Sequence, residues 1–246
     1  MSDQPLLSIV VVCKNPGPRL RATLESIWGQ NERDFELIVI DGGSSEGSLE
    51  WLKTQSERIH RLSSRPDRGV YDAMNRGIEA ARGEWLLFLG ADDRLASPTV
   101  LSSALGALRT ANEGVVAGEA RYDDGRVYRF RIGANPVARN FVHHQCAFYR
   151  RRLFVEHGLY DATLAIMGDY DLNVRLKIAG VAFKAIPLHV SNCGIAGISD
   201  GGRWQVYREE ISVRHRYFPA WRCWLWDLGG IVRYLRKKIV RAAARH

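Results

Sequence analysis

The side chains of this chain that could do chemistry are carboxylates that directly follow apolar stretches. Asp41 comes after residues 35–40, and Asp92 and Asp93 come just after residues 85–89. Adjacent carboxylates repel each other and lose hydration beside an apolar strand, and a divalent cation that prefers oxygen ligands removes both penalties. Asp92 and Asp93 therefore indicate a Mg²⁺ or Mn²⁺ site. The alternative is that Asp92 caps the following helix and Asp93 is solvated.

A second carboxylate pair, Asp169 and Asp171, opens a predicted helix at residues 168–179. Acidic side chains in the first turn of a helix are stabilised by its dipole, and this structural role alone could explain the pair. His143 and His144 are adjacent, so on an extended segment at most one of them faces a site. Because no third ligand stands at useful spacing, the two histidines do not predict a zinc centre.

Signatures of several other enzyme classes are missing from the sequence. No GxGxxG or GxxxxGK[ST] pattern follows the first apolar run, and no serine lies in a GxSxG turn. This disfavours a nicotinamide-binding domain, a phosphate-binding P-loop and a serine hydrolase. A nucleotidyltransferase would require a glycine- and lysine-rich loop after the first strand, and residues 14–17 hold little of that composition.

The elements that must position these side chains alternate between strand and helix. Continuous apolar runs predict buried parallel strands, and apolar residues at helical spacing predict the helices between them. The predicted strands are residues 6–12, 35–40, 59–63, 85–89 and 115–118, and the predicted helices are residues 20–27, 49–52, 70–82 and 98–108. This alternation predicts an α/β fold, a doubly wound and mostly parallel sheet with helices on both faces. In such a sheet, ligands bind at the carboxyl ends of the strands, where the carboxylates stand.

The pattern changes after residue 120. Residues 121–132 predict a hairpin around Asp124 and Gly125, and the glycine-rich residues 194–202 predict a loop. Further predicted strands lie at residues 145–149 and 181–190. The chain is therefore expected to divide into a body of residues 1–202, with halves at 1–120 and 121–202, and a helical segment of residues 203–246.

Positive charge is concentrated in the C-terminal segment. The net charge is +8, and residues 203–246 hold 11 Lys and Arg against 3 Asp and Glu, so the whole excess lies there. Apolar residues such as Trp221, Trp224 and Leu228 recur among them at three- and four-residue spacing, which predicts a basic amphipathic helix. Its expected partner is an anionic membrane surface. Nucleic acid is less expected, because proteins that bind nucleic acid usually carry their basic residues across a face of the fold. The alternative is that the apolar stripe packs on the domain or on a second copy, giving a homo-oligomer.

The cysteines and the apolar runs indicate the cellular compartment in which the protein is expected. The four cysteines lie far apart without a CxxC pair, which fits a reducing compartment. No signal peptide is recognisable at the N-terminus, and no apolar run approaches the roughly 20 residues that cross a bilayer. A cytoplasmic protein bound at the inner face of the membrane is therefore expected.

Taken in order, several segments resemble the motifs of the family 2 glycosyltransferases, which have the GT-A fold, and in particular members that build bacterial surface polysaccharides and glycolipids. The segments are SIVVVCKN at residues 8–15, VIDGGS at 39–44, DRGVYDAMNRG at 67–77, LFLGADD at 87–93, HQCAFYR at 144–150 and GDYDL at 168–172. Each match is weak alone, but their order and spacing together are specific. The resemblance makes residues 1–120 a nucleotide-sugar-binding half and residues 121–202 an acceptor and catalytic half.

The resemblance implies a donor-binding role for six residues, one of which, Asp92, is also a candidate metal ligand. Asp41 would bond the nucleobase of a nucleotide-sugar, and Cys13 and Asn15 would line the same pocket. Arg68 would lie beside the base or the phosphates. His144 would stand near the donor phosphates or the acceptor.

It also implies where the metal and the chemistry lie. Asp92 would reach the ribose or the metal, and Asp93 would bind the divalent ion, Mg²⁺ or Mn²⁺. Asp169 matches the position of the catalytic base. Gln145 and Asp171 would belong to the acceptor side.

Two glycines depart from the family pattern. Gly90 replaces the first acid of the usual DxDD element, and Gly168 replaces the glutamate that usually precedes the base. Any contact from that glutamate is lost or supplied by Asp171. The QxxRW element of processive polymerising relatives is also missing.

The resemblance therefore implies an inverting, non-processive glycosyltransferase. It would move one sugar from a nucleotide-sugar, with a UDP-sugar expected, to a hydroxyl of an acceptor sugar or lipid-linked saccharide in polysaccharide or glycolipid assembly. The alternatives are a non-catalytic module that binds a nucleotide-sugar or a membrane, and a nucleotidyltransferase.

Overall fold

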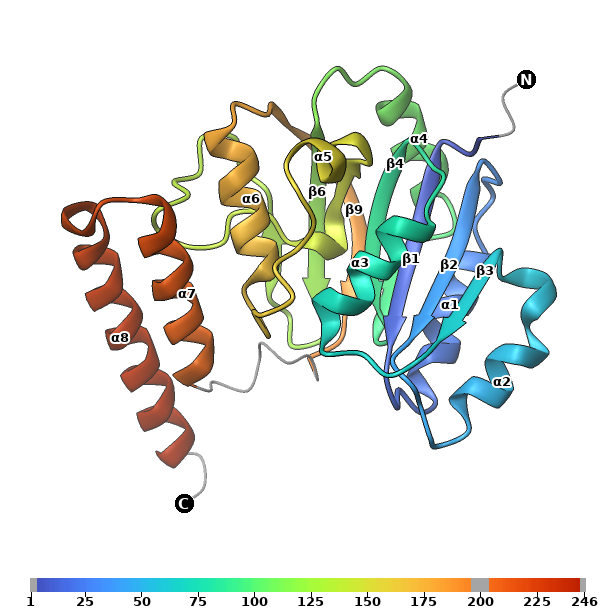
Figure 1. Cartoon of the computed structure of the whole chain (residues 1–246), viewed down its shortest axis with the longest axis horizontal. Helices are drawn as coiled ribbons and strands as arrows, with labels where there is room; N and C mark the ends of the chain where they lie inside the picture. The colour runs from blue at the N-terminus through green and yellow to red at the C-terminus, as the bar shows by residue number, and fades with distance from the viewer. Residues whose placement is uncertain (1–3, 196–203, 244–246) are drawn as a thin grey trace.

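The computed structural model of the chain describes residues 4–195 and 204–243, with side chains described as far as residue 239. In this part of the chain the strands form one mixed sheet (Figure 1). The strand order is β3-β2-β1-β4-β8-β6-β9-β5, and β7 pairs with β6. The strands are β1 Leu7–Cys13, β2 Phe35–Asp41, β3 Arg61–Ser64, β4 Trp85–Gly90, β5 Asp93–Leu95, β6 Val115–Tyr122, β7 Val127–Arg129, β8 Ala147–Arg150 and β9 Phe183–Cys193.

The first half of the sheet is parallel, as the apolar runs predict. Leu7 at the start of β1 pairs with Phe35 of β2 on one side and with Trp85 of β4 on the other. All residues of β1 are buried, because helices cover both faces of this part of the sheet. The carboxyl ends of β1, β2 and β4 consequently meet at one edge.

The second half of the sheet is mixed. β8 runs antiparallel to both β4 and β6 and joins the two halves, while β9 runs parallel to β6 and antiparallel to β5. Parallel pairing still accounts for most of the paired residues. The expected α/β fold, doubly wound with a mostly parallel sheet, is confirmed.

Helices cover both faces of the sheet (Figure 1). They are α1 Arg19–Trp28, α2 Ser48–Thr54, α3 Val70–Ala80, α4 Val100–Arg109, α5 Arg152–Glu156, α6 Gly168–Ile178, α7 Trp204–Tyr217 and α8 Ala220–Ala243, with short 3₁₀ turns η1 Ser56–Arg58 and η2 His144–Cys146. Ile9 and Val11 of β1 belong to the core that α1 and α4 share. Val10 and Val12 belong to the core beneath α3 and α6. Complete burial of an aliphatic side chain stabilises the fold by about 1.5–3 kcal/mol, so the alternating faces of β1 hold both layers in place.

Helix α3 lies especially close to the sheet. A Cβ on Gly77 would stand 2.2 Å from Cγ1 of Val10 on β1. Glycine at this position therefore lets α3 settle against the strand. The close contact holds the N-terminal end of α3 beside the carboxyl ends of β1 and β4.

Several element boundaries differ from the predicted ones. The predicted helix at residues 70–82 ends at Ala80, and Gly83 lies next to Ser8, whose N atom a Cβ would approach to 2.5 Å. The sequence suggests Gly83 as the residue that ends this helix, but the structure requires glycine there for packing against β1. The strand predicted at residues 145–149 begins only at Ala147, because His144–Cys146 form the turn η2.

The C-terminal helices form a hairpin in which α7 contacts α6 and α8 contacts α7, at the side of the molecule away from α2 (Figure 1). Arg214 of α7 is fully buried. It donates to the carbonyl oxygen of Val137 at 2.6 Å and to Glu210 at 2.7 Å, and it pairs with Asp227 of α8. This network joins both helices to the loop that precedes η2. Residues 196–203, which hold most of the predicted glycine-rich loop and the expected domain boundary, lie outside the described residues.

One face of α8 packs on α7 and the opposite face is open. Cys223 and Gly230 are buried against the hairpin. The exposed side chains on the other face include Trp221, Trp224, Leu225, Leu228, Val232, Leu235 and Ile239. The predicted apolar stripe is therefore not covered by the described part of the chain. Among the described residues, no helix has both the length and the apolar character needed to cross a bilayer.

Candidate active site

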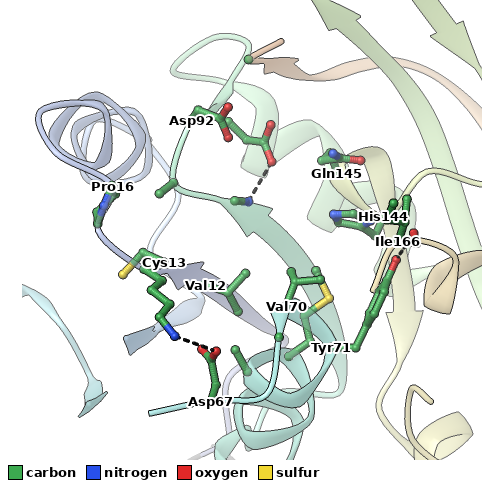
Figure 2. A pocket seen from close by; sticks show the side chains of 18 of the residues that line it. Val12, Cys13, Pro16, Asp67, Val70, Tyr71, Asp92, His144, Gln145 and Ile166 are labelled. Atoms are coloured by element: carbon green, nitrogen blue, oxygen red, sulfur yellow. Dashed lines mark hydrogen bonds and ion pairs between the residues drawn. The ribbon is translucent and has the colours of Figure 1, made fainter. Parts of the chain in front are cut away.

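A cavity of about 520 Å³ opens at the carboxyl ends of β1 and β4, the edge at which a doubly wound sheet binds ligands. Its walls come from the end of β1, the start of α3, the end of β4, η2 and the turn before α6. Figure 2 shows Asp67, Asp92 and His144 on different walls of this cavity. The polar lining side chains include Lys14, Asp67, Arg68, Tyr71, Asp92, Asp93, His144 and Gln145.

Asp41 closes β2 and is completely buried. Its Oδ2 accepts the N–H of Gly43 at 3.1 Å, the N–H of Ser44 at 3.0 Å and the hydroxyl of Ser64 at 2.6 Å. Burial raises the pKa of Asp41, but these hydrogen bonds outweigh it and hold the pKa below its usual value. Asp41 therefore fixes the conformation of residues 42–44, and its side chain lies behind the residues that line the cavity.

Cys13 and Asn15 follow β1 but lie differently. Cys13 lines the cavity, with its Sγ 3.7 Å from Oδ1 of Asp41. Burial, and secondarily the Asp41 charge, raise the pKa of the Cys13 thiol, which therefore stays neutral. Asn15 has a positive φ of 46° and accepts the N–H of Ser45 at 2.9 Å through its Oδ1. Asn15 thus ties the loop after β1 to the loop after β2.

The predicted donor residue Arg68 has a neighbour that the sequence reasoning did not single out. The Arg68 side chain is 80% exposed and pairs with Asp72 at 2.8 Å. Asp67 is only 7% exposed and lies between Nζ of Lys14 at 3.8 Å and the guanidinium of Arg76 at 3.9 Å. Asp67 is therefore the buried acid of this wall.

Gly42 makes room for that carboxylate. A Cβ on Gly42 would stand 2.1 Å from Oδ2 of Asp67. Two features of the sequence could have indicated this contact. A glycine directly follows Asp41, and an acidic residue, Asp67, follows β3 at the same edge of the sheet. Only the packing of the two loops shows that they share one space.

Asp92 and Asp93 follow β4, as predicted, and both line the cavity. Asp93 is 3% exposed, and its Oδ2 accepts the N–H of Gly90 at 2.7 Å. Burial raises the pKa of Asp93 to about 6, with that hydrogen bond and the nearby His144 acting in the opposite direction. A Cβ on Gly90 would stand 3.2 Å from the same oxygen, so the glycine favours the turn in which its N–H holds Asp93.

Among the described residues, no cluster of three or more His, Cys, Asp or Glu side chains forms a complete metal site. Asp92 and Asp93 nevertheless fit the ion that the sequence predicts. Mg²⁺ is commonly bound through one or two carboxylates, with waters and substrate phosphates completing its shell, and Mn²⁺ favours the same oxygen ligands. Asp93 supports this fit, because a buried carboxylate with a raised pKa is a ligand whose charge a cation would satisfy.

The two adjacent histidines face different surroundings. His143 is stacked on Tyr128 with ring centroids 3.7 Å apart and is hydrogen bonded to Tyr122 at 2.7 Å. Burial lowers the pKa of His143 to about 4, so this ring is neutral at physiological pH. His144 and Gln145 line the cavity from the turn η2. Only His144 lines the cavity, in line with the expectation that at most one histidine faces the site. The two side chains diverge because the turn η2 begins at His144, and not because both residues lie on a strand.

Asp169 stands in the first turn of α6 and is 8% exposed. Its Oδ1 accepts the N–H of Tyr170 at 2.8 Å, and its Oδ2 accepts the side-chain N–H of Asn140 at 2.9 Å. The hydroxyl of Tyr71 and Nδ1 of His144 each lie 3.4 Å from the carboxylate. Because Tyr71 and His144 line the cavity, Asp169 lies directly behind its wall.

The glycine before Asp169 is explained by Tyr71. A Cβ on Gly168 would stand 2.7 Å from the Tyr71 ring. Tyr71 is buried, and its hydroxyl donates to the carbonyl oxygen of Ile166 at 2.5 Å. The ring thus fills the space that a larger residue at 168 would need.

Asp171 points away from the cavity. It is 2% exposed and accepts from Arg175 at 3.0 Å, Tyr217 at 2.8 Å and Arg216 at 3.3 Å. These partners tie α6 to α7. The structure therefore brings Cys13, Arg68, Asp92, Asp93, His144 and Gln145 to one cavity, and it buries Asp41 and Asp169 behind the walls. Asn15 is exposed and does not line the cavity, and Asp171 lies elsewhere.

Comparison with known proteins identifies the family of the chain. The family model described as Glycosyl transferase family 2 matches residues 8–163. A protein of Mycobacterium bovis named PGL/p-HBAD biosynthesis glycosyltransferase is 37% identical over 183 residues, which are 70% of this chain and 69% of that protein. An uncharacterized glycosyltransferase of Mycobacterium tuberculosis is 30% identical over 188 residues, covering 72% of this chain and 71% of the relative.

Solved structures share the fold at low sequence identity. S. aureus TarS residues 1–349, crystallised in complex with UDP-GlcNAc, superpose with a TM-score of 0.68 at 15% identity, over 84% of this chain and 66% of that one. The mannosyltransferase PcManGT from Pyrobaculum calidifontis, in complex with GDP-Man and Mn²⁺, has a TM-score of 0.63 at 16% identity, over 99% of this chain and 81% of that one. The sequence matches show that the chain belongs to glycosyl transferase family 2, and its fold is the GT-A fold.

Proposed function

We propose that this glycosyltransferase moves one sugar per encounter from a nucleotide-sugar to an acceptor hydroxyl, with inversion at the anomeric carbon. The observation that carries the proposal is the position of Asp169. Its carboxylate is buried behind Tyr71 and His144, while Asp92 and Asp93 form another wall of the same cavity. A proton acceptor directly behind one wall of the cavity and an acidic pair on another wall are the parts that such a transfer needs.

In the proposed reaction, Asp169 accepts the proton of the acceptor hydroxyl as that oxygen attacks the anomeric carbon. The bond from this carbon to the nucleoside diphosphate breaks, and the leaving group takes its electron pair. The products are the glycoside, the nucleoside diphosphate and protonated Asp169. A single displacement inverts the anomeric centre, and general-base assistance of this kind typically contributes 10²–10⁴-fold in rate.

We assign the donor to the wall formed by Cys13, Asp67 and Arg68, with Asp41 and Asn15 shaping the loops behind it. UDP is the proposed nucleotide, and the complexes of S. aureus TarS with UDP and UDP-GlcNAc support it. Asp92 and Asp93 would hold Mg²⁺ or Mn²⁺, which when bound supplies Lewis-acid stabilisation to the departing diphosphate.

We assign the acceptor to the wall formed by His144 and Gln145, and propose a sugar or lipid-linked saccharide as its class. The names of the mycobacterial relatives, which refer to PGL/p-HBAD biosynthesis, are consistent with this assignment. We further propose that α8 holds the protein at an anionic membrane, at its cytoplasmic face. The exposed apolar stripe of α8 and the exposed Arg222, Arg236, Lys237 and Lys238 on the same helix support this.

The function is tested by incubating the full chain with UDP-, GDP- and dTDP-sugars, Mn²⁺ and a panel of saccharide acceptors. We expect release of the nucleoside diphosphate from a UDP-sugar, and a product whose anomeric configuration, read by NMR, is opposite to that of the donor. A retained configuration would overturn the single displacement. Donor binding without turnover across the panel would favour a non-catalytic binding module.

A further inference from the structure

A line of hydrogen bonds leads from the core of the sheet to Asp169. The Tyr149 hydroxyl donates to Oδ1 of Asn173 at 3.0 Å, and Nδ2 of Asn173 donates to Oδ1 of Asn140 at 3.3 Å. Nδ2 of Asn140 then donates to Oδ2 of Asp169 at 2.9 Å. Tyr149 and Asn173 are completely buried. Side chains from β8, α6 and the loop before η2 thus form one chain of hydrogen bonds that ends on the Asp169 carboxylate.

The direction of this line is set by the backbone of Val142. The Val142 N–H donates to Oδ1 of Asn140 at 3.3 Å, and the Val142 carbonyl oxygen accepts from Nδ2 of Asn173 at 2.9 Å. An asparagine side chain can present either its oxygen or its nitrogen to a neighbour, and the groups around it decide which. With both amides fixed by one buried residue, Asn140 can present only an N–H to Asp169.

We propose that Asn140 is a positioning residue for the transfer, and that Asn173 and Tyr149 hold it in the donating orientation. The proposal rests on the proposed function of Asp169 as the base. An N–H fixed on Oδ2 restricts the rotation of the carboxylate, and hydrogen bonds to charged groups are the stronger ones. Donors aligned in one direction also polarise each other, which strengthens the last bond of the line.

The other titratable groups that contact Asp169 do not replace Asn140. The Tyr71 hydroxyl already donates to Ile166, and His144 lies 3.4 Å away on the cavity side. His143, from the same segment, is turned towards Tyr122 and Tyr128. Asn140 therefore makes the shortest side-chain hydrogen bond to the carboxylate in the described structure.

The decisive variant is Asn140→Asp. The new side chain has the same size and can still accept from the Val142 N–H and from Asn173, but it presents an oxygen to Asp169 in place of an N–H. We expect kcat at pH 7 to fall at least about tenfold, with the KM for the donor within about twofold, because only the base is affected. The acid limb of the pH dependence of kcat should move up by about one pH unit or more, since a second carboxylate beside Asp169 disfavours its ionised form.

A milder pair of variants covers the case in which Asn140→Asp does not fold. Tyr149→Phe removes the first donor of the line. Tyr160→Phe is its matched control, because the Tyr160 hydroxyl is equally buried but has no hydrogen-bond partner within the described residues. Tyr149→Phe should lower kcat about two- to fivefold and shift the acid limb in the same direction, whereas Tyr160→Phe should leave both unchanged.

The outcomes separate this proposal from the one on which it rests. If Asp169→Asn is inactive but folded Asn140→Asp and Tyr149→Phe keep the wild-type kcat and pH profile, the positioning role is wrong. If Asp169→Asn itself stays active, the base assignment fails first. An equal loss in Tyr149→Phe and Tyr160→Phe would show general packing rather than a directed line of donors.

Discussion

Three glycines near the cavity each leave room for a neighbouring group that the site uses. Gly42 leaves space for the carboxylate of Asp67, Gly168 for the ring of Tyr71, and Gly90 allows a turn whose N–H holds Asp93. Two of these glycines, Gly90 and Gly168, are the positions at which the sequence departs from its family pattern. At both departures, the glycine therefore leaves room for a side chain or a turn beside the cavity.

Asp93 carries a prediction about pH and metal. Its pKa is raised to about 6 by burial, above the usual 3.8, so the folded state binds this proton more tightly than the unfolded state does. The ionised side chain therefore costs stability, a cost that grows from about pH 4 and is complete above about pH 6, reaching about 2–3 kcal/mol. In metal-free buffer, Asp93→Asn should be more stable than the wild type at pH 7 and equal to it at pH 4, measured by urea unfolding.

The same pair of proteins tests the metal. Mn²⁺ should raise the melting temperature of the wild type at pH 7 and leave that of Asp93→Asn unchanged, because the ion satisfies the buried charge. Equal stability of the two proteins across the pH range would contradict the buried, ionised state of Asp93. An equal response to Mn²⁺ would place the ion elsewhere.

At the scale of elements, helix α7 supports the segment that leads into Asp169, the proposed base. Glu209 of α7 is 7% exposed and accepts three consecutive backbone N–H groups, from Ala165 at 3.3 Å, Ile166 at 2.8 Å and Met167 at 3.1 Å. This turn comes immediately before α6 and Asp169. The C-terminal hairpin is therefore part of the support of the site.

Glu209→Ala should lower the free energy of unfolding by about 2–4 kcal/mol, because buried N–H groups lose a charged partner. The measurement is chemical denaturation of the full chain. Arg208→Ala is the matched control, since this side chain is the exposed neighbour on the same helix. If both variants lost the same small amount, α7 would not hold the turn.

The sequence predicted those elements whose signal is local. The apolar runs of β1, β2 and β4 predicted the parallel half, because every second residue there packs on a different helix layer. The mixed half depends on pairing between β8, β6 and β9, which are distant in sequence and carry no local signal of their partners.

The same distinction applies to the site. The carboxylates after apolar strands could be predicted, since a strand end is visible in the sequence. Asn140 and Asn173 could not, because their role depends on the buried backbone of Val142 between them. The role of Glu209 could not be predicted for a similar reason, because its partners are backbone N–H groups of another segment.

On the scale of the whole molecule, the two faces of α8 have separate roles. One face anchors the hairpin through Asp227 and Cys223, while Trp221 is 73% exposed and Trp224 57% exposed on the other. An exposed apolar stripe beside basic residues is typical of helices that lie in a lipid interface. The orientation of α8 thus turns the apolar stripe away from α7, on which the helix packs.

The double variant Trp221→Ser, Trp224→Ser should bind vesicles that contain anionic lipid at least about tenfold more weakly than the wild type. Each tryptophan is expected to insert apolar surface into the lipid, and a tenfold loss corresponds to about 1.4 kcal/mol. Co-flotation with the vesicles measures it. Val155→Ser is the control, since Val155 is 80% exposed on α5, away from the stripe. Unchanged flotation, together with a dimer in the wild type that the double variant loses, would assign the stripe to a second copy of the chain.

The most direct test of the account is the turnover of Asp169→Asn beside its affinity for the donor. The amide keeps the size of the side chain but cannot accept the acceptor's proton. The account predicts a folded protein that binds the UDP-sugar as the wild type does, yet transfers about 10²–10⁴-fold more slowly. Transfer at a rate close to that of the wild type would contradict it.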